Sequence, residues 1–188
     1  MTRSMLLFFI LLLSACASFD KTNILPGQEV GGLGFSFTVP TQKSWFAVEY
    51  GSGHRIKLSQ LNDLDSYSIQ ISLNRGPSGG MFQSAEAHLN ALKRHKRSVS
   101  RFNHKEWLDT RYGDLCVRYT SAGEDWRGRN NAGPAMVASV GLVCAHPEIA
   151  NVLIDIEISR RYELDAPTSD LAAYADELFS SVEYESIE

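Results

Sequence analysis

The segment at residues 151–159 (NVLIDIEIS) places valine or isoleucine at every second position. Because successive side chains of a β-strand point to opposite faces, this pattern predicts a strand with one buried face. The side chains expected in the core are Val152, Ile154, Ile156 and Ile158. On the other face, Asp155 and Glu157 are expected to form a solvated surface, with an acid/base pair as the alternative.

Five further segments have the composition of strands, and short turns such as GSG at 51–53 separate them. They are 34–40 (GFSFTVP), 44–50 (SWFAVEY), 54–61 (HRIKLSQL), 67–73 (YSIQISL) and 101–110 (RFNHKEWLDT). Two main helices are expected, one from about Ser84, which can cap it, and one after Pro167. Strands in runs with few helices predict an α+β domain, with an antiparallel sheet of about six to eight strands and two helices packed on it.

Two cysteines give the register of a hairpin. The flanks of Cys116 (DLCVRYT) and Cys144 (VASVGLVCAH) both have strand character, and the turn-rich GEDWRGRNNAG lies between them. Antiparallel pairing of the two cysteines centres the hairpin on residue 130 and puts Tyr119 opposite Gly141. A disulfide between Cys116 and Cys144 is therefore expected, contributing roughly 3–4 kcal/mol by restricting the unfolded chain. A metal or redox pair would instead favour CxxC spacing and nearby ligands.

The amino terminus (MTRSMLLFFILLLSACASFD) indicates where such a domain is located. Its apolar run, Met5–Leu13, has nine residues, whereas crossing the hydrocarbon core takes about 20. A basic residue precedes the run and small residues follow it, which is typical of a signal peptide. Leu13-Ser14-Ala15-Cys16 resembles the lipobox of bacterial lipoproteins, in which the cysteine is lipidated and becomes the first residue of the mature protein.

The resemblance implies a signal peptide at 1–15, the lipidated Cys16 with a tether that ends at residue 33, and a single domain at 34–188. Ala17 follows the cysteine where aspartate would imply retention, so the periplasmic face of the outer membrane is expected, with the inner membrane as the alternative. Removal of Arg3 with the signal peptide leaves 17 basic and 22 acidic residues, a formal net charge of −5. This balance disfavours nucleic-acid binding.

The order of the elements resembles that of PsbP/Mog1-like domains. Those domains begin with a G-F-x-F-x-x-P strand, continue with a tryptophan-containing strand, and have one helix in mid-chain and another at the end. The corresponding residues here are GFSFTVP at 34–40 and Trp45. The resemblance implies this fold over most of residues 30–185, in a fold group that shares no single activity.

No residue pattern of the sequence points to a catalytic, metal or cofactor centre. The histidines form no HxH or HExxH pair and are expected to face solvent; they are His54, His88, His95, His104 and His146. The glycine-rich GPSGG at 76–80 lacks the lysine of a phosphate-binding loop. No cofactor is expected.

A basic group at the end of the first expected helix is one candidate for binding. Lys93, Arg94 and Arg97 share an arc of that helix. There they would complement the helix dipole or contact anionic lipid head groups.

The tip of the expected hairpin is a second candidate. It carries Trp126, Arg127 and Arg129, and tryptophan and arginine are enriched in binding hot spots. The tryptophan would either fold back onto the sheet or contact a partner protein.

Together these features favour a lipid-anchored lipoprotein that acts as a non-catalytic binding or accessory module, with another envelope protein as its partner. An immunity lipoprotein against a toxin delivered to the periplasm is the alternative among binding proteins. An envelope hydrolase built from dispersed residues and a purely structural role are the remaining alternatives.

Overall fold

The computed structural model describes residues 22–32, 34–41, 45–49, 55–60, 66–76, 84–95, 102–125, 135–163 and 171–185. The elements in chain order are β1 (Thr22–Ile24), β2 (Glu29–Gly32), β3 (Phe35–Thr38), β4 (Trp45–Glu49), β5 (Arg55–Gln60), β6 (Ser66–Arg75), α2 (Ala85–His95), β7 (Phe102–Leu108), β8 (Cys116–Asp125), β9 (Ala135–Ala145), β10 (Val152–Tyr162), α3 (Leu171–Ser180) and β11 (Glu183–Tyr184). Every strand and helix expected from the sequence is present, and β1, β2 and β11 are additional.

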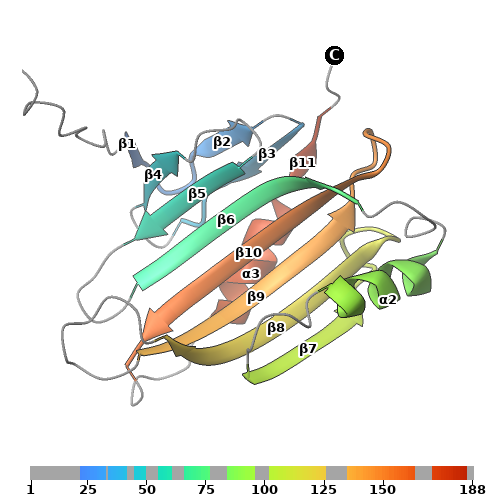
Figure 1. Cartoon of the computed structure of the whole chain (residues 1–188). Coiled ribbons are helices and arrows are strands. Elements are labelled where there is room, and N and C mark those ends of the chain that lie inside the picture. Colours follow the sequence, from blue (N-terminus) through green and yellow to red (C-terminus); the bar gives the residue numbers. More distant parts are fainter. Residues whose placement is uncertain are drawn as a thin grey trace, which may run out of the picture.

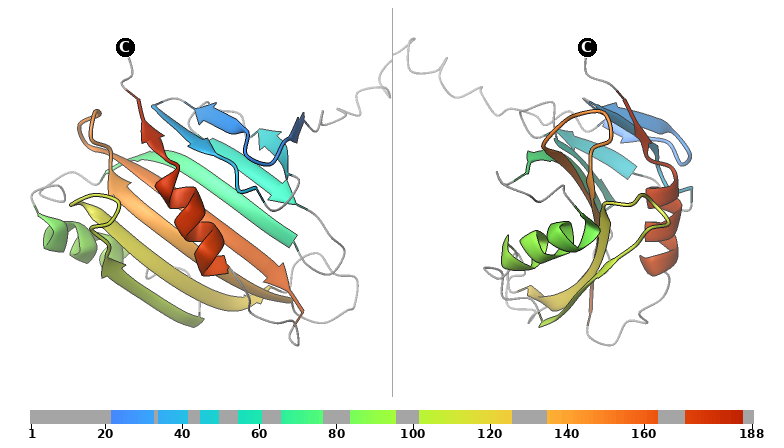
Figure 2. Two further views of the ribbon diagram at one scale, coloured as in Figure 1. Left: turned by 180° about the vertical axis from the view of Figure 1, so that it is seen from behind. Right: turned by 90° about the vertical axis from the view of Figure 1, so that its right-hand side faces the viewer.

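The main sheet has eight antiparallel strands in the order β1-β4-β5-β6-β10-β9-β8-β7, and β11-β3-β2 form a second, three-stranded sheet (Figure 1). Helix α3 packs across one face of the main sheet, against β9 and β10. Helix α2 lies on the other face, against β7 and β8 (Figure 2). The predicted α+β architecture, an antiparallel sheet of about six to eight strands with two helices packed on it, is confirmed.

The main core lies between the sheet and α3. Alternation gives each central strand one apolar face, so the strands contribute the fully buried Ile69, Ile71, Ile154, Ile156 and Ile158. Strand β3 adds Phe35 and Phe37, and α3 adds Ala175 and Leu178. The inward residues predicted for 151–159 are thus confirmed, except that Val152, at the start of β10, is only half-buried.

The tether expected over residues 16–33 is wrong from residue 22 onward. Thr22–Ile24 pairs with β4 at the edge of the main sheet, and Glu29–Gly32 pairs with β3. Ile24 is buried in the main core, and Val30 packs against this core. Neither TNI nor EVGG has the alternating apolar pattern of a strand, and pairing with distant strands decides their structure.

The β8–β9 hairpin has the predicted register. Cys116 lies opposite Cys144 and is joined to it by a buried disulfide, and Tyr119 lies opposite Gly141. A Cβ atom at position 141 would lie 2.0 Å from Cζ of Tyr119. Only glycine therefore allows the tyrosine ring to lie flat across β9, an arrangement in which an aromatic side chain covers a cross-strand glycine.

Helix α2 begins as predicted, and its buried face includes a histidine. The Ala87 N–H donates to Oγ of Ser84 (3.1 Å), which makes Ser84 the N-cap. His88 is fully buried, and its Nε2 lies 3.3 Å from the Val143 carbonyl oxygen. The prediction that His88 faces solvent is wrong because, at helical spacing, it falls in the same arc as Ala85 and Leu89. Burial lowers its pKa below 6.5.

Candidate binding groove

Two adjoining pockets have volumes of about 460 Å³ each, and the first opens beside the carboxyl end of α3. Tyr112 and Tyr184 line both pockets, so the two are treated as one site, the tyrosine groove. The first pocket lies among the Arg111–Tyr112 loop, α3 and β11, with Phe179 and Val182 as apolar walls. The second lies between the loop that leads into β8 and the β9–β10 turn at 146–151.

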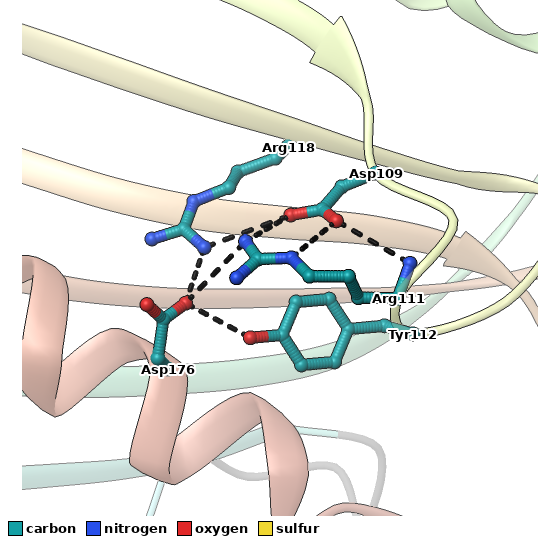
Figure 3. Close-up of polar contacts among 5 residues, drawn as sticks. All are labelled: Asp109, Arg111, Tyr112, Arg118 and Asp176. Atoms are coloured by element: carbon teal, nitrogen blue, oxygen red, sulfur yellow. Dashed lines mark hydrogen bonds and ion pairs between the residues drawn. The ribbon is translucent and has the colours of Figure 1, made fainter.

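Three residues of the first pocket, Arg111, Tyr112 and Asp176, belong to a network of polar side chains (Figure 3). Arg111 donates two hydrogen bonds to Asp109, from Nε to Oδ1 (2.8 Å) and from Nη2 to Oδ2 (2.6 Å). Nη1 of Arg118 donates to Oδ1 of Asp176 and lies 3.6 Å from Oδ2 of Asp109. The Tyr112 hydroxyl donates to the same Asp176 oxygen (2.8 Å). The network thus joins the loop before β8 to α3.

The sequence predicted none of these five residues as a site, and Arg118 is the one that lies deepest along the sheet, within β8. Alternation along β8 puts it on the face of Cys116, inside the main core, where its guanidinium lies 5.5 Å from the centre of the Phe179 ring. A buried charge requires partners, and Asp176 and Asp109 supply them. An arginine at an inward position of a strand is itself a signal that a carboxylate lies opposite, but the sequence does not say which one.

The arginines keep the two carboxylates ionised. A side-chain hydrogen bond from Arg111 lowers the pKa of Asp109 below its ordinary value. Burial acts to raise the pKa of Asp176, but the hydrogen bonds from Arg118 and Tyr112 outweigh burial, and the pKa is lowered. Two paired arginines and two paired aspartates carry no net charge. The network is therefore suited to holding the loop that carries Tyr112 in one position.

A buried histidine orders the wall of the second pocket. Nε2 of His146 donates to the Gly34 carbonyl (2.7 Å), and Nδ1 accepts from the backbone N–H groups of Glu148 and Ile149 (3.2 and 3.1 Å). His146 is 5% exposed, so the prediction that it faces solvent is also wrong. Its partners are backbone groups brought together by the β9–β10 turn and by β3, which the sequence does not reveal.

Tyr184 stands where the two pockets meet. Its ring packs edge-on against His146, with 5.3 Å between the ring centres. Burial raises the pKa of Tyr184 to about 12, so its side chain is a neutral phenol at physiological pH. The centre of the groove is consequently aromatic and uncharged.

On the opposite face of the sheet, Asp155 and Glu157 are half-buried, and the prediction of a solvated surface is wrong. The Tyr119 hydroxyl lies 2.7 Å from Oε2 of Glu157 and 3.3 Å from Oδ1 of Asp155. Oγ of Ser139 donates to Oε1 of Glu157 (3.2 Å). The cause is Tyr119, whose ring crosses Gly141 and covers this part of β10.

Several predicted site residues lie outside what the structure describes. The described residues do not include Cys16, Arg97, Trp126, Arg127, Arg129 and His54. For Lys93, Arg94 and His95 the helical backbone is described, but the side chains are not. His104 is exposed as predicted, with its Nε2 2.6 Å from Oε1 of Glu106. In the described part of the chain, no three metal-ligating side chains gather into a site, and no helix has the length and hydropathy to cross a membrane.

These elements and their pairing define an antiparallel α+β domain with a helix on each face of the main sheet. The crystal structure of the Ran-binding protein Mog1p of Saccharomyces cerevisiae is similar, with a TM-score of 0.52 and 11% identity, over 90% of this chain and 97% of that one. No family model and no curated protein matches the sequence. The chain therefore has a Mog1-like fold, and at this identity the likeness establishes the fold alone.

Proposed function

We propose that the chain is a lipid-anchored lipoprotein of the outer membrane whose domain acts as a non-catalytic binding module on the periplasmic side. The observation that carries the binding role is the tyrosine groove. Tyr112 is held by Asp176, and Tyr184 is packed on His146, so the groove is formed before a partner arrives. Rigid aromatic side chains beside an arginine are the residue types that contribute most to binding energy at protein interfaces.

The anchoring part of the proposal is supported by the sequence at residues 13–16. Two or more acyl chains hold a protein stably at a bilayer, whereas one chain does not. Cys16→Ser is expected to abolish lipid labelling and to leave the precursor uncut at this site. Lipid labelling or processing that persisted in this variant would contradict the anchor.

Photocrosslinking in intact cells tests the binding role. A photoreactive amino acid is placed in the full-length lipoprotein at Asp114 or Pro147 on the groove, and at Ser68 on the opposite face as the control. Crosslinking of one envelope protein from the groove positions, and not from Ser68, is the expected result. If no position gave a protein crosslink above background, the binding role would be rejected.

A further inference from the structure

We propose that the tyrosine groove binds an extended, basic segment of a partner protein. The segment adds to the open edge of β11 and places apolar side chains beside Tyr112 and Tyr184. This inference rests on the binding role proposed above, and it names the surface and the chemistry of the partner.

Strand β11 lies at the edge of the three-stranded sheet, with β3 on one side. The Glu185 N–H donates to the Gly34 carbonyl (3.0 Å), just beyond the pairing of Tyr184 with Phe35. In an antiparallel pair, alternate residues bond across the pair. The N–H and C=O of Tyr184 therefore point away from β3, toward the edge where the described chain supplies no further strand. Such an edge is a template for an extended peptide.

The groove offers two adjoining places for side chains. Residues two apart on a strand share a face and lie about 7 Å from each other, and the two pockets adjoin through Tyr112 and Tyr184. The second pocket has apolar walls from Pro147, Ile149 and Ala150, which suit an aliphatic side chain. Two alternate residues of an added strand can thus occupy the two pockets.

The exposed charge around the groove is negative. Asp114 lines the second pocket, and Glu148 lies between the lining residues Pro147 and Ile149. Both carboxylates are exposed, and neither has an ion-pair partner within the described ranges. Arg111, the basic residue of the lining, is already paired with Asp109. A segment that carries lysine or arginine complements this rim, because complementary charge favours both encounter and the correct partner.

A synthetic peptide tests the chemistry directly. The probe is an acetylated and amidated nonapeptide of alternating lysine and valine, titrated by fluorescence anisotropy into the full-length lipoprotein in a non-ionic detergent. One control peptide has glutamate in place of each lysine. A second control has proline in place of two valines, and these prolines cannot donate a backbone hydrogen bond. The lysine peptide should bind at least about tenfold more tightly than either control, and added salt should weaken it.

Variants of the chain test the surface. Ala150→Trp should fill the second pocket, and Asp114→Lys combined with Glu148→Lys should reverse the charge of the rim. Each change should weaken binding of the lysine peptide by roughly tenfold or more. The matched controls are Ser68→Trp on the opposite face and the pair Glu29→Lys and Glu86→Lys, at exposed positions that do not line the groove. These controls should leave the affinity unchanged, and circular dichroism verifies the fold of each variant.

Equal affinity for the lysine and glutamate peptides, no binding of either, or unchanged binding by Ala150→Trp would overturn the inference. If the crosslinked envelope protein were captured from Ser68 and bound the groove variants normally, the groove would be rejected while the binding role survived. Sedimentation velocity provides a further check. A dimer of the chain that Ala150→Trp dissociates would make a second copy the occupant, and would overturn the basic-segment inference.

Discussion

The two faces of the main sheet come from the same alternating strands, yet they are stabilised in different ways. The face under α3 is a continuous apolar core, in which the side chains of β6 and β10 are fully buried. The face under α2 has a small apolar cluster around Val117 and Val143, and beyond it polar side chains bonded to one another. Buried area stabilises the first face, whereas specific hydrogen-bonded partners stabilise the second.

Two neighbouring residues of β10 test this difference most strongly, because Ile156 faces α3 and Glu157 faces the opposite side. Ile156→Ala removes a fully buried side chain from a close-packed core and should lower the free energy of unfolding by about 3–4 kcal/mol. Glu157→Ala should cost about 1 kcal/mol, since Asp155 remains within reach of the Tyr119 hydroxyl. Urea unfolding followed by circular dichroism measures both. Equal losses would contradict the contrast between the faces.

Arg118 is a buried charge within the apolar face, as is Arg160, whose guanidinium lies 5.5 Å from the centre of the Tyr67 ring. Arg118→Met removes a partner of Asp176 and Asp109 and should cost about 3 kcal/mol, the lower end of the range for a broken buried pair, because Asp176 is 42% exposed. The double variant Arg118→Met with Asp176→Leu should recover part of this loss in the same unfolding measurement. A double variant less stable than Arg118→Met alone would show that the ion pair is not the source of the effect.

Gly141 tests how the face under α2 is stabilised. Gly141→Ala should destabilise the domain by about 2 kcal/mol, since the new Cβ would overlap the Tyr119 ring. In a Tyr119→Ala background the same change should cost much less, and a double-mutant cycle measures the coupling. Additive losses would mean that Tyr119 does not depend on the glycine.

The smallest effect concerns pH and His88. Because burial lowers the pKa of His88, the unfolded chain takes up a proton at a higher pH than the folded chain. The stability that neutral His88 contributes is therefore fully present above pH 6.5 and is lost as the pH falls from 6.5 toward its folded pKa. Urea midpoints measured between about pH 7.5 and 5 should decrease less in His88→Leu than in the wild type. An unchanged slope in the variant would exclude this contribution.

Long elements of the fold could be predicted from the sequence because their patterns are local. The strict alternation at 151–159 identifies β10, and two cysteines with strand-like flanks are enough to fix the register of β8 and β9. Strands β1, β2 and β11 have two to four residues each, so pairing alone decides them. For short elements the sequence pattern is therefore a poor guide.

The groove depends on partners that are distant in the chain. Arg118 and Asp176 are 58 residues apart, and His146 bonds to Gly34 across 112 residues. Such distant partners decide whether a histidine or an arginine is buried, and the local periodicity of the sequence does not reveal them. The tyrosine groove combines two loops, a helix end and a two-residue strand, so its residues could be placed only in the folded chain.

Under the lipid anchor proposed at Cys16, the early start of β1 limits how far the domain can move from the membrane. With the lipid proposed at Cys16, six peptide steps lead to Thr22, and at no more than about 3.6 Å per step they reach roughly 20 Å. Strand β7, at the other edge of the eight-stranded sheet, is seven strand spacings of about 4.8 Å away from β1, or roughly 34 Å. An anchored domain of this shape samples only a thin layer above the bilayer, and a partner must enter that layer to meet it.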